Sequence, residues 1–294
     1  MAKGLIISNI SNTYDVEDLD NENIIRCIPR GKFKKDDITP VVGDKIEFEY
    51  QQDGTGVISE ILERKNYIKR PKMSNLTQMI FVISMKMPKP DLFLLDKQLV
   101  FAEFNNLKSI ICLNKIDLEN DVIIEEIEEL YRNIGYRVIK TNAKLGSGIE
   151  EVCKCLENNI TAFSGNSGVG KSTLINNIFD DVLTSEGEIS NKNKRGKNTT
   201  TAIKLYKINE NSYIADTPGF STFDISEIES KDLANYFIDL SKYVQKCEYT
   251  GCTHIKENEC GIKQALEEGK ISKQRYDTYC KLYKELKEKE QHKW

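Results

Sequence analysis

A glycine-rich loop in the middle of the chain limits the folds that are open to it. Residues 165–172 read Gly-Asn-Ser-Gly-Val-Gly-Lys-Ser and fit the pattern G-x-x-x-x-G-K-[ST]. This phosphate loop follows an apolar stretch typical of a strand (160–164) and opens a segment with helical spacing from Lys171 to Phe179. Glycines let the backbone wrap phosphate groups, so that successive N–H groups point at them. The sequence therefore predicts a nucleotide-binding α/β domain; the alternative is a turn that only caps a helix.

The side chains at the end of the phosphate loop have expected roles. Lys171 supplies a positive charge to the β- and γ-phosphate oxygens, and the Ser172 hydroxyl is short enough to reach Mg²⁺. We expect the loop and the residue after it to bind the nucleotide: Gly165, Asn166, Ser167, Gly168, Val169, Gly170, Lys171, Ser172 and Thr173.

A second motif, Asn114-Lys115-Ile116-Asp117, follows the apolar stretch 108–113 and predicts specificity for guanine. The Asp117 carboxylate can accept hydrogen bonds from the N1–H and N2–H₂ edge of guanine. Adenine presents no such pair of donors and would leave the acid unpaired. Asn114 can tie this segment to the phosphate loop, and the aliphatic part of Lys115 can lie on the base.

The segment Thr141-Asn142-Ala143-Lys144 follows an expected strand at residues 136–140. It occupies the place of the S-A-K element, whose backbone contacts the guanine O6 atom. Because Asn142 stands where serine is usual, we expect only backbone contacts from Asn142, Ala143 and Lys144.

Asp216-Thr217-Pro218-Gly219 fits the pattern D-x-x-G after an apolar stretch. In this motif the Asp reaches Mg²⁺ through a water molecule, and the Gly N–H meets the γ-phosphate. One of Thr199–Thr201 is expected to ligate Mg²⁺ beside Ser172; Thr200 is the candidate, although the sequence does not choose among the three. The expected catalytic residues are Lys171, Ser172, Thr200, Asp216 and Gly219.

The order of these motifs is unusual. G domains ordinarily begin with the phosphate loop and carry N-K-x-D late, whereas here N-K-x-D (114–117) comes first and D-x-x-G (216–219) last. The order predicts a circularly permuted G domain. Strands that alternate with helices after residue 77 indicate a mostly parallel, doubly wound sheet. The permutation also places the γ-phosphate-sensing motifs directly before the last part of the chain.

Shifts in composition divide the chain into three expected domains. Residues 1–64 hold short apolar stretches between Asn, Asp, Gly and Pro clusters, which predicts a small all-β barrel or sandwich. Residues 65–225 form the permuted G domain, and residues 226–294 read as mainly helical. Five basic residues of the first domain form either a solvated hairpin face or a phosphate-contacting loop: Arg26, Arg30, Lys32, Lys34 and Lys35.

Cys247, Cys252, His254 and Cys260 have the spacing of a metal site, C-x₄-C-x-H-x₅-C. Three thiolates and an imidazole make a closed set of ligands, which suits one structural Zn²⁺ and leaves no open position for catalysis. The alternative is a group of buried free cysteines with an incidental histidine.

Charge and hydropathy exclude several classes of protein. The 294 residues include 42 basic and 46 acidic side chains, so any nucleic-acid surface must be local. No apolar run approaches the roughly 20 residues of a membrane-spanning helix, and the N-terminus lacks the pattern of a secretory signal. We therefore expect a cytoplasmic protein with no membrane partner, in which cysteines are thiols or metal ligands.

The permuted motif order, the β-rich N-terminal segment and the cysteine–histidine spacing together resemble the ribosome small-subunit-dependent GTPase A (RsgA) family. The resemblance covers essentially the whole chain. It implies a circularly permuted α/β P-loop GTPase domain between an RNA-binding OB-fold barrel at residues 1–64 and a mostly helical zinc-binding domain. It also implies hydrolysis of GTP to GDP and phosphate, one zinc ion, and Mg²⁺ with GTP. The implied role is late maturation of the 30S ribosomal subunit, through binding to it and its 16S rRNA. We expect a monomer.

Two positions depart from the usual hydrolytic machinery. Phe220 stands where many GTPases place a water-positioning Gln, and Asn198 stands where the family tends to carry a His. Hydrolysis then depends on Lys171, Mg²⁺ and groups supplied by the ribosome, so we predict slow intrinsic turnover, stimulation by 30S subunits and release after hydrolysis. One alternative is a nucleotide-sensing, rRNA-binding scaffold with vestigial hydrolysis. Another is a permuted GTPase of the large subunit, which the OB-like domain and the cysteine cluster disfavour.

Overall fold

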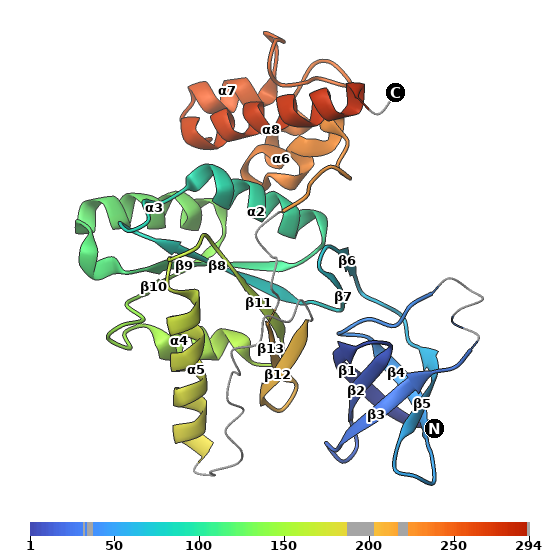
Figure 1. The fold of residues 1–294 in the computed structure, drawn as a ribbon. Helices are drawn as coiled ribbons and strands as arrows, with labels where there is room; N and C mark the ends of the chain where they lie inside the picture. Colours follow the sequence, from blue (N-terminus) through green and yellow to red (C-terminus); the bar gives the residue numbers. More distant parts are fainter. Residues whose placement is uncertain (32, 34–37, 187–202, 217–222, 293–294) are drawn as a thin grey trace. The chain divides into compact units, whose positions relative to one another are not determined.

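The computed structural model describes residues 1–31, 33, 38–186, 203–216 and 223–292 of the chain (Figure 1). The chain divides into two compact units. The first unit comprises residues 1–78, 149–164 and 172–220, and the second comprises residues 79–148, 165–171 and 221–294. Among the helices of the described ranges, none combines the length and the apolar character needed to cross a membrane.

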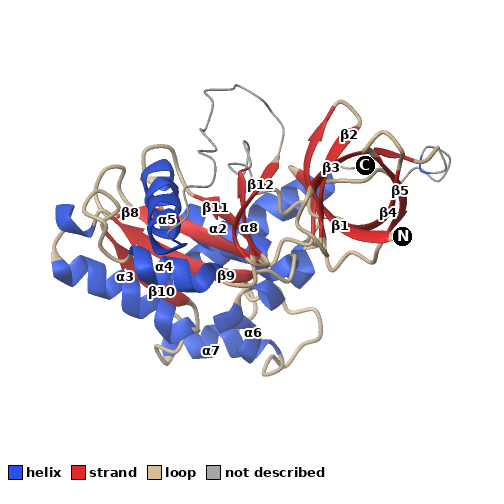
Figure 2. Cartoon of the chain, turned by 90° about the horizontal axis from the view of Figure 1, so that it is seen from below, coloured by secondary structure: helices blue, strands red, loops and turns tan. Residues whose placement is uncertain are grey.

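Five strands of the first unit close into a barrel (Figure 2): β1 (Ala2–Ile10), β2 (Thr13–Asp18), β3 (Ile24–Pro29), β4 (Lys45–Tyr50) and β5 (Gly56–Ile61). β1 pairs with both β2 and β4, and β5 pairs with both β3 and β4, so the order is β1-β2-β3-β5-β4-β1. Apolar side chains fill the inside, among them Ile6, Val16, Cys27, Phe48 and Ile58. The predicted all-β N-terminal barrel, of the five-stranded OB type, is confirmed.

Strand β2 carries acidic residues that the protein partly buries. Glu17 is 5% exposed, and its Oε1 atom lies 2.7 Å from Nζ of Lys207, which is 190 residues away in the sequence. Asp18 is 1% exposed and accepts a hydrogen bond of 2.8 Å from the Asp20 N–H. These partners compensate the burial of charge, which is costly for an unpaired carboxylate.

The rest of the first unit is a small mixed sheet with helices and a short hairpin: β11 (Ile160–Ser164), β12 (Lys204–Asn209), β13 (Ser212–Asp216), α4 (Ile149–Leu156), most of α5 (Lys171–Glu186), β6 (Tyr67–Lys69) and β7 (Lys72–Ser74). β11 and β13 are parallel, whereas β12 and β13 are antiparallel, and β12 also pairs with β1 of the barrel. Helix α5 runs beyond the predicted end at Phe179, because residues 180–186 contain no glycine or proline to stop it.

The second unit contains three sheet-forming strands in the order β10-β9-β8. Their bounds, and those of the adjoining helices, are β8 (Gln78–Ser84), β9 (Lys108–Asn114), β10 (Arg137–Thr141), α2 (Leu92–Phe104), the 3-10 turn η1 (Ile116–Leu118) and α3 (Asp121–Ile134). β9 and β10 are parallel, and every residue of β8 is buried, as expected for an inner strand of an α/β sheet. The predicted alternation of strands and helices is confirmed.

Helical segments make up the C-terminal part of the second unit: η2 (Ser230–Tyr236), α6 (Ile238–Val244), α7 (Gly261–Glu267) and α8 (Lys273–Gln291). Arg275 on α8 is fully buried; its Nη1 and Nη2 atoms lie 2.7 Å from carboxylate oxygens of Asp96 on α2 and Asp239 on α6. Tyr131 and Gln274 also donate to Asp96, each at 2.8 Å. This group of five residues, the Arg275 cluster, joins the C-terminal helices to α2.

Candidate functional site

Two glycines of the phosphate loop occupy positions where a side chain would clash with neighbouring atoms. Gly165 and Gly170 have φ angles of +143° and +102°, which side chains rarely allow. A Cβ atom on Gly165 would lie 2.2 Å from the Val82 carbonyl oxygen, and one on Gly170 would lie 2.3 Å from Asn114 Nδ2. The two glycines therefore let the loop approach β8 and the N-K-x-D segment closely.

Lys171, at the start of α5, holds its ammonium group at the phosphate loop. Nζ donates hydrogen bonds to the carbonyl oxygens of Gly165 at 2.6 Å and Asn166 at 3.0 Å. Burial lowers the pKa of the Lys171 amine. The ammonium group therefore lies against the backbone of the phosphate loop.

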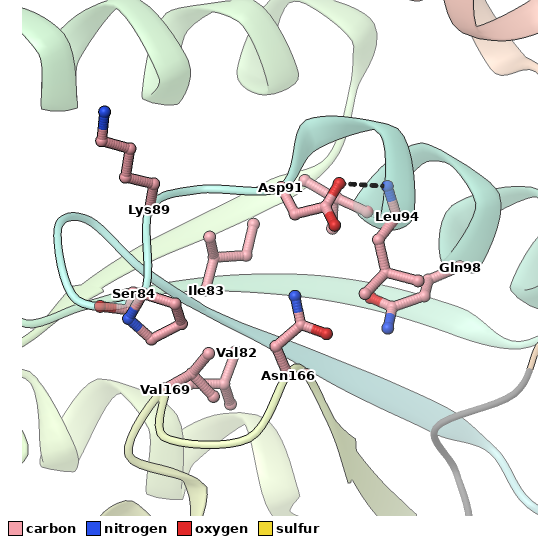
Figure 3. A pocket seen from close by; sticks show the side chains of 12 residues that line it. Val82, Ile83, Ser84, Lys89, Asp91, Leu94, Gln98, Asn166 and Val169 are labelled. Atoms are coloured by element: carbon pink, nitrogen blue, oxygen red, sulfur yellow. Dashed lines mark hydrogen bonds between the residues drawn. The ribbon is translucent and has the colours of Figure 1, made fainter.

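A cavity of about 20 Å³ separates the phosphate loop from α2 (Figure 3). Asn166 and Val169 line it from the loop, Ser84 lines it from the end of β8, and Leu94 lines it from α2. The Asp91 carboxylate caps α2 by accepting a hydrogen bond of 2.9 Å from the Leu94 N–H. The first turn of α2 therefore lies across this cavity from the phosphate loop.

Asn114 connects three segments of the second unit. It is 1% exposed, and its Nδ2 donates to the Val169 carbonyl oxygen of the phosphate loop at 2.8 Å. Its Oδ1 accepts hydrogen bonds from the Ala143 N–H at 3.0 Å and from the Thr141 hydroxyl at 3.1 Å. The predicted link between N-K-x-D and the phosphate loop is therefore present, and it extends to the Thr141–Lys144 segment.

Lys115 makes a second link to the phosphate loop. Its Nζ donates to the Gly168 carbonyl oxygen at 2.7 Å and to the Met87 carbonyl oxygen, and the residue has a left-handed φ of +61°. The side chain therefore stretches across the space between its own turn and the loop.

Asp117 and Asn142 line a depression of about 400 Å³ on the second unit. Asn142 is buried; its N–H donates to the Ser147 carbonyl oxygen at 3.0 Å, and its Oδ1 accepts from the Leu145 N–H at 3.2 Å. The amide side chain therefore stabilises its own turn. Ile116 lines the same depression.

The remaining predicted nucleotide and magnesium residues belong to the first unit or lie outside the described residues. Ser172 and Thr173 are exposed in the first turn of α5, and Asp216 is half-buried at the end of β13. Thr200, Gly219, Phe220 and Asn198 lie outside the described residues, as do Thr199 and Thr201.

The four predicted metal ligands converge in the second unit, where their ligand atoms all lie within 4.8 Å of one another. Nδ1 of His254 lies 3.4 Å from Sγ of Cys247 and 3.4 Å from Sγ of Cys260, and these two sulfurs are 3.9 Å apart. A tetrahedral zinc with Zn–S of about 2.3 Å and Zn–N of about 2.0 Å requires about 3.8 Å between sulfurs and about 3.5 Å between sulfur and nitrogen. The observed distances fit a metal ion of this kind.

The chemistry of the Cys/His cluster also favours a cation. His254 and Cys260 are each 3% exposed, and burial lowers the pKa of the imidazole, which keeps it neutral as a ligand. Burial raises the pKa of the Cys252 thiol to about 12, so a thiolate there requires a positive charge beside it. His254 faces the cysteine sulfurs through Nδ1, which the spacing of the ligands does not reveal.

The basic segment of the barrel is only partly described. Arg26 lies 3.5 Å from Asp15, and Arg30 lies 2.6 Å from Glu49, with both arginines exposed. Lys32, Lys34 and Lys35 lie outside the described residues, so contact of this segment with phosphates stays a prediction.

Sequence reasoning missed two groups of residues outside the motifs. The Arg275 cluster joins residues up to 179 positions apart, and Glu257 accepts hydrogen bonds around His254. A buried arginine has no local sequence signal. Glu257 has one, since it lies within the cysteine–histidine segment.

Comparison with known proteins identifies the family. The profile of the RsgA GTPase family matches residues 61–226, and that of the RsgA N-terminal domain matches residues 3–58. A protein named small ribosomal subunit biogenesis GTPase RsgA from Thermotoga petrophila is 39% identical, over 97% of this chain and 96% of its own. A protein of the same name from Caldanaerobacter subterraneus is also 39% identical, over 99% of this chain and 98% of its own.

Two solved structures share the fold. YjeQ from Thermotoga maritima has a TM-score of 0.85 at 38% identity, covering 97% of this chain and 98% of its own. YloQ, described as a circularly permuted GTPase, has a TM-score of 0.83 at 35% identity, covering 98% of this chain and 96% of its own. The predicted fold class, with its permuted G domain, is therefore confirmed. By its sequence profile, its full-length relatives and its fold, the chain belongs to the RsgA GTPase family.

Proposed function

We propose that this protein is a GTPase that binds the small ribosomal subunit and assists its late maturation. The observation that carries the proposal is the position of Asn114, whose amide joins the phosphate loop to the guanine-specific segment at 2.8 Å. The full-length relatives are named for GTP hydrolysis and for biogenesis of the small subunit, which supports the same activity here.

The roles proposed for the site residues follow from their chemistry. Asp117 pairs with the N1–H and N2–H₂ edge of guanine, and the aliphatic part of Lys115 lies on the base. Backbone groups of residues 142–144 face the base, and those of residues 165–173 surround the phosphates. Lys171 balances charge on the β- and γ-phosphates as the bond to the leaving group breaks.

Magnesium and zinc are the metals that we propose. The Ser172 hydroxyl and one of Thr199–Thr201 would hold Mg²⁺, with Asp216 acting through water; this ion would neutralise charge on the phosphates. Cys247, Cys252, His254 and Cys260 would hold one Zn²⁺, which stabilises the C-terminal domain. The closed ligand set suits a structural ion, because each donor faces the same point.

The wider setting of this activity is also a proposal. We place the domain boundaries near residues 64 and 225, with the barrel contacting 16S rRNA and the protein acting as a cytoplasmic monomer. Support comes from the barrel at residues 2–61, which has the strand order of a fold used for oligonucleotide binding. Slow hydrolysis without the subunit is expected, since residue 220 is a phenylalanine and cannot orient water.

The test of the subunit assignment is co-sedimentation with separated 30S and 50S subunits in the presence of a non-hydrolysable GTP analogue. We expect binding to 30S and little binding to 50S. Equal binding to both, or preference for 50S, would refute the assignment to the small subunit.

A second candidate is a nucleotide-sensing rRNA-binding scaffold with vestigial hydrolysis. Two residues favour the scaffold, because they replace groups that usually assist hydrolysis: Phe220 and Asn198. Three residues of the hydrolytic motifs are intact and favour hydrolysis: Lys171, Ser172 and Asp216. Multiple-turnover hydrolysis in the presence of 30S subunits separates the two functions.

A further inference from the structure

A single carboxylate organises the loop that carries His254. Oε1 of Glu257 accepts hydrogen bonds from the Thr253 N–H at 2.9 Å and from the Thr253 hydroxyl at 2.8 Å. Oε2 accepts from the N–H groups of Ile255 at 3.2 Å and Lys256 at 3.1 Å. Backbone donors on both sides of His254 therefore converge on one side chain.

His254 itself has a backbone conformation that needs support. Its φ angle is +61°, in the left-handed region that residues other than glycine rarely occupy. Its own N–H donates to Cys252 Sγ, and its Nδ1 faces Cys247 and Cys260 at 3.4 Å. In this conformation the backbone donor and the ring nitrogen of one residue both point toward the ligand sulfurs.

The opposite side of the loop is fixed by α8 and α7. The Tyr276 hydroxyl donates to the His254 carbonyl oxygen at 2.7 Å, and the Tyr279 hydroxyl donates to the Thr253 carbonyl oxygen at 2.9 Å. Lys263 Nζ donates to the Glu257 carbonyl oxygen at 2.8 Å. The carbonyl groups thus face the helices, and Glu257 alone receives the backbone N–H groups of Thr253, Ile255 and Lys256 in the described part of the chain.

We propose that Glu257 is the positioning residue of the metal site: its carboxylate holds residues 253–256 in the conformation that directs His254 Nδ1 at the metal. The inference rests on the proposed zinc site and adds to it a residue that is not a ligand. Outer residues of this kind typically change metal affinity about 10- to 100-fold when they are replaced.

The chemistry of a carboxylate explains why glutamate suits this position. Its two oxygens accept from several donors at once, and a carboxylate makes stronger hydrogen bonds than a neutral acceptor. Glutamine has the same length, but its NH₂ group cannot accept hydrogen bonds, so the donors that face one of the two Glu257 oxygens would lose their acceptor. Aspartate keeps the charge but is one methylene shorter, so it should restore part of the function.

The experiment measures zinc in the full-length protein and its release to an excess of a colorimetric chelator. The variants are Glu257→Gln and Glu257→Asp, with Glu259→Gln as the matched control, because Glu259 is an exposed acid of the same segment and loses the same charge. We expect one zinc per wild-type chain and release that is about 10- to 100-fold faster for Glu257→Gln. Glu257→Asp should be intermediate, and Glu259→Gln should match the wild type.

Cobalt spectra separate positioning from a general loss of structure. With Co²⁺ at saturation, Glu257→Gln should show the same tetrahedral d–d bands as the wild type but require a higher Co²⁺ concentration to reach them. Should Glu257→Gln fail to fold, Thr253→Val carries the test, because it removes one hydroxyl donor and keeps every backbone N–H; faster zinc release is expected.

The outcomes are distinguishable. If the wild type holds zinc and Glu257→Gln releases it at the wild-type rate, the role of Glu257 is refuted and the zinc site stands. If the wild type holds no zinc when purified under reducing conditions and supplied with the metal, the zinc site and the inference built on it are both refuted.

Discussion

Replacing Arg275 with methionine removes a fully buried guanidinium and leaves two carboxylates without their partner. Arg275 and Asp96 have side chains that are 0% exposed, and that of Asp239 is 7% exposed. Asp96 would keep the Tyr131 and Gln274 donors, whereas Asp239 would lose hydrogen bonds of 2.7 and 3.1 Å. The variant therefore creates buried, poorly compensated negative charge.

The expected size of this effect follows from buried ion pairs in general. Removing one partner of such a pair costs about 3–5 kcal/mol of unfolding free energy. At roughly 3 °C of midpoint shift per kcal/mol for a domain of this size, the thermal midpoint should fall by about 9–15 °C. Arg275→Lys should fall by less, because it keeps the charge but loses the planar fork that reaches both carboxylates.

The assay is thermal unfolding followed by near-ultraviolet circular dichroism, with Lys273→Met as the control. Lys273 lies on the same helix with 81% of its side chain exposed, so its loss should move the midpoint by no more than about 2 °C. A triple variant, Arg275→Met with Asp96→Asn and Asp239→Asn, should recover part of the loss, because no charge stays buried. A shift below about 3 °C for Arg275→Met would refute the reasoning that this cluster holds the C-terminal helices to α2.

Three further predictions concern the nucleotide site and its connection to the C-terminal domain. Asp117→Asn should lower GTP hydrolysis at least about 100-fold and allow hydrolysis of xanthosine triphosphate, because an amide can donate to the 2-oxo group of xanthine. If the variant still prefers GTP in a hydrolysis assay, the role assigned to Asp117 is wrong. Gly170→Ala should weaken binding of a fluorescent GDP analogue about 5- to 100-fold, because the new side chain strains the backbone and displaces Asn114. Gly269→Ala is the control and should leave the affinity unchanged, because Gly269 also has a positive φ but no atom lies within 4 Å of the new Cβ. Hydrogen exchange of residues 226–294 should differ between complexes with GDP and with a non-hydrolysable GTP analogue, since the permuted order joins these residues directly to D-x-x-G; identical exchange would refute that coupling.

Local signals explain which elements the sequence predicts well. The bounds of β11 at residues 160–164 agree with the expected ones, and α2 (Leu92–Phe104) lies in the part after residue 77 where strands and helices are expected to alternate. Asp91 caps α2, and Asn105 ends it, so both limits are encoded within a few residues of the helix. β11 is a short apolar run bounded by the phosphate loop, and every one of its residues is buried.

Long-range partners explain what the sequence does not predict. β2 has an acidic pattern that is unfavourable in a buried strand until Lys207 is brought beside Glu17. Nothing in the local sequence indicates that Arg275 is buried, since its partners Asp96 and Asp239 are distant in the chain. Pairings of this kind depend on the tertiary fold and leave no periodic pattern.

The candidate site was more predictable than its support. The four metal ligands lie within one short segment, so their spacing predicts that they meet at one point. The contact of Asn114 with the phosphate loop is long-range, and it was predictable because N-K-x-D and the phosphate loop occur together as parts of one kind of domain. Motif spacing did not reveal that His254 faces the sulfurs through Nδ1, or that Glu257 collects the neighbouring N–H groups. Those features depend on the left-handed backbone at His254, which the residue type does not favour.

Hydrolysis of GTP by the purified protein, alone and with 30S subunits, tests the central claim most directly. Lys171→Ala is the control, because it removes the ammonium group that lies against the Gly165 and Asn166 carbonyl oxygens and to which we assign phosphate binding. We expect slow turnover alone, strong stimulation by 30S subunits, and loss of that stimulation in the variant. Equal rates with and without 30S subunits, despite measurable binding to them, would contradict the account and favour a scaffold that senses nucleotide without using its hydrolysis.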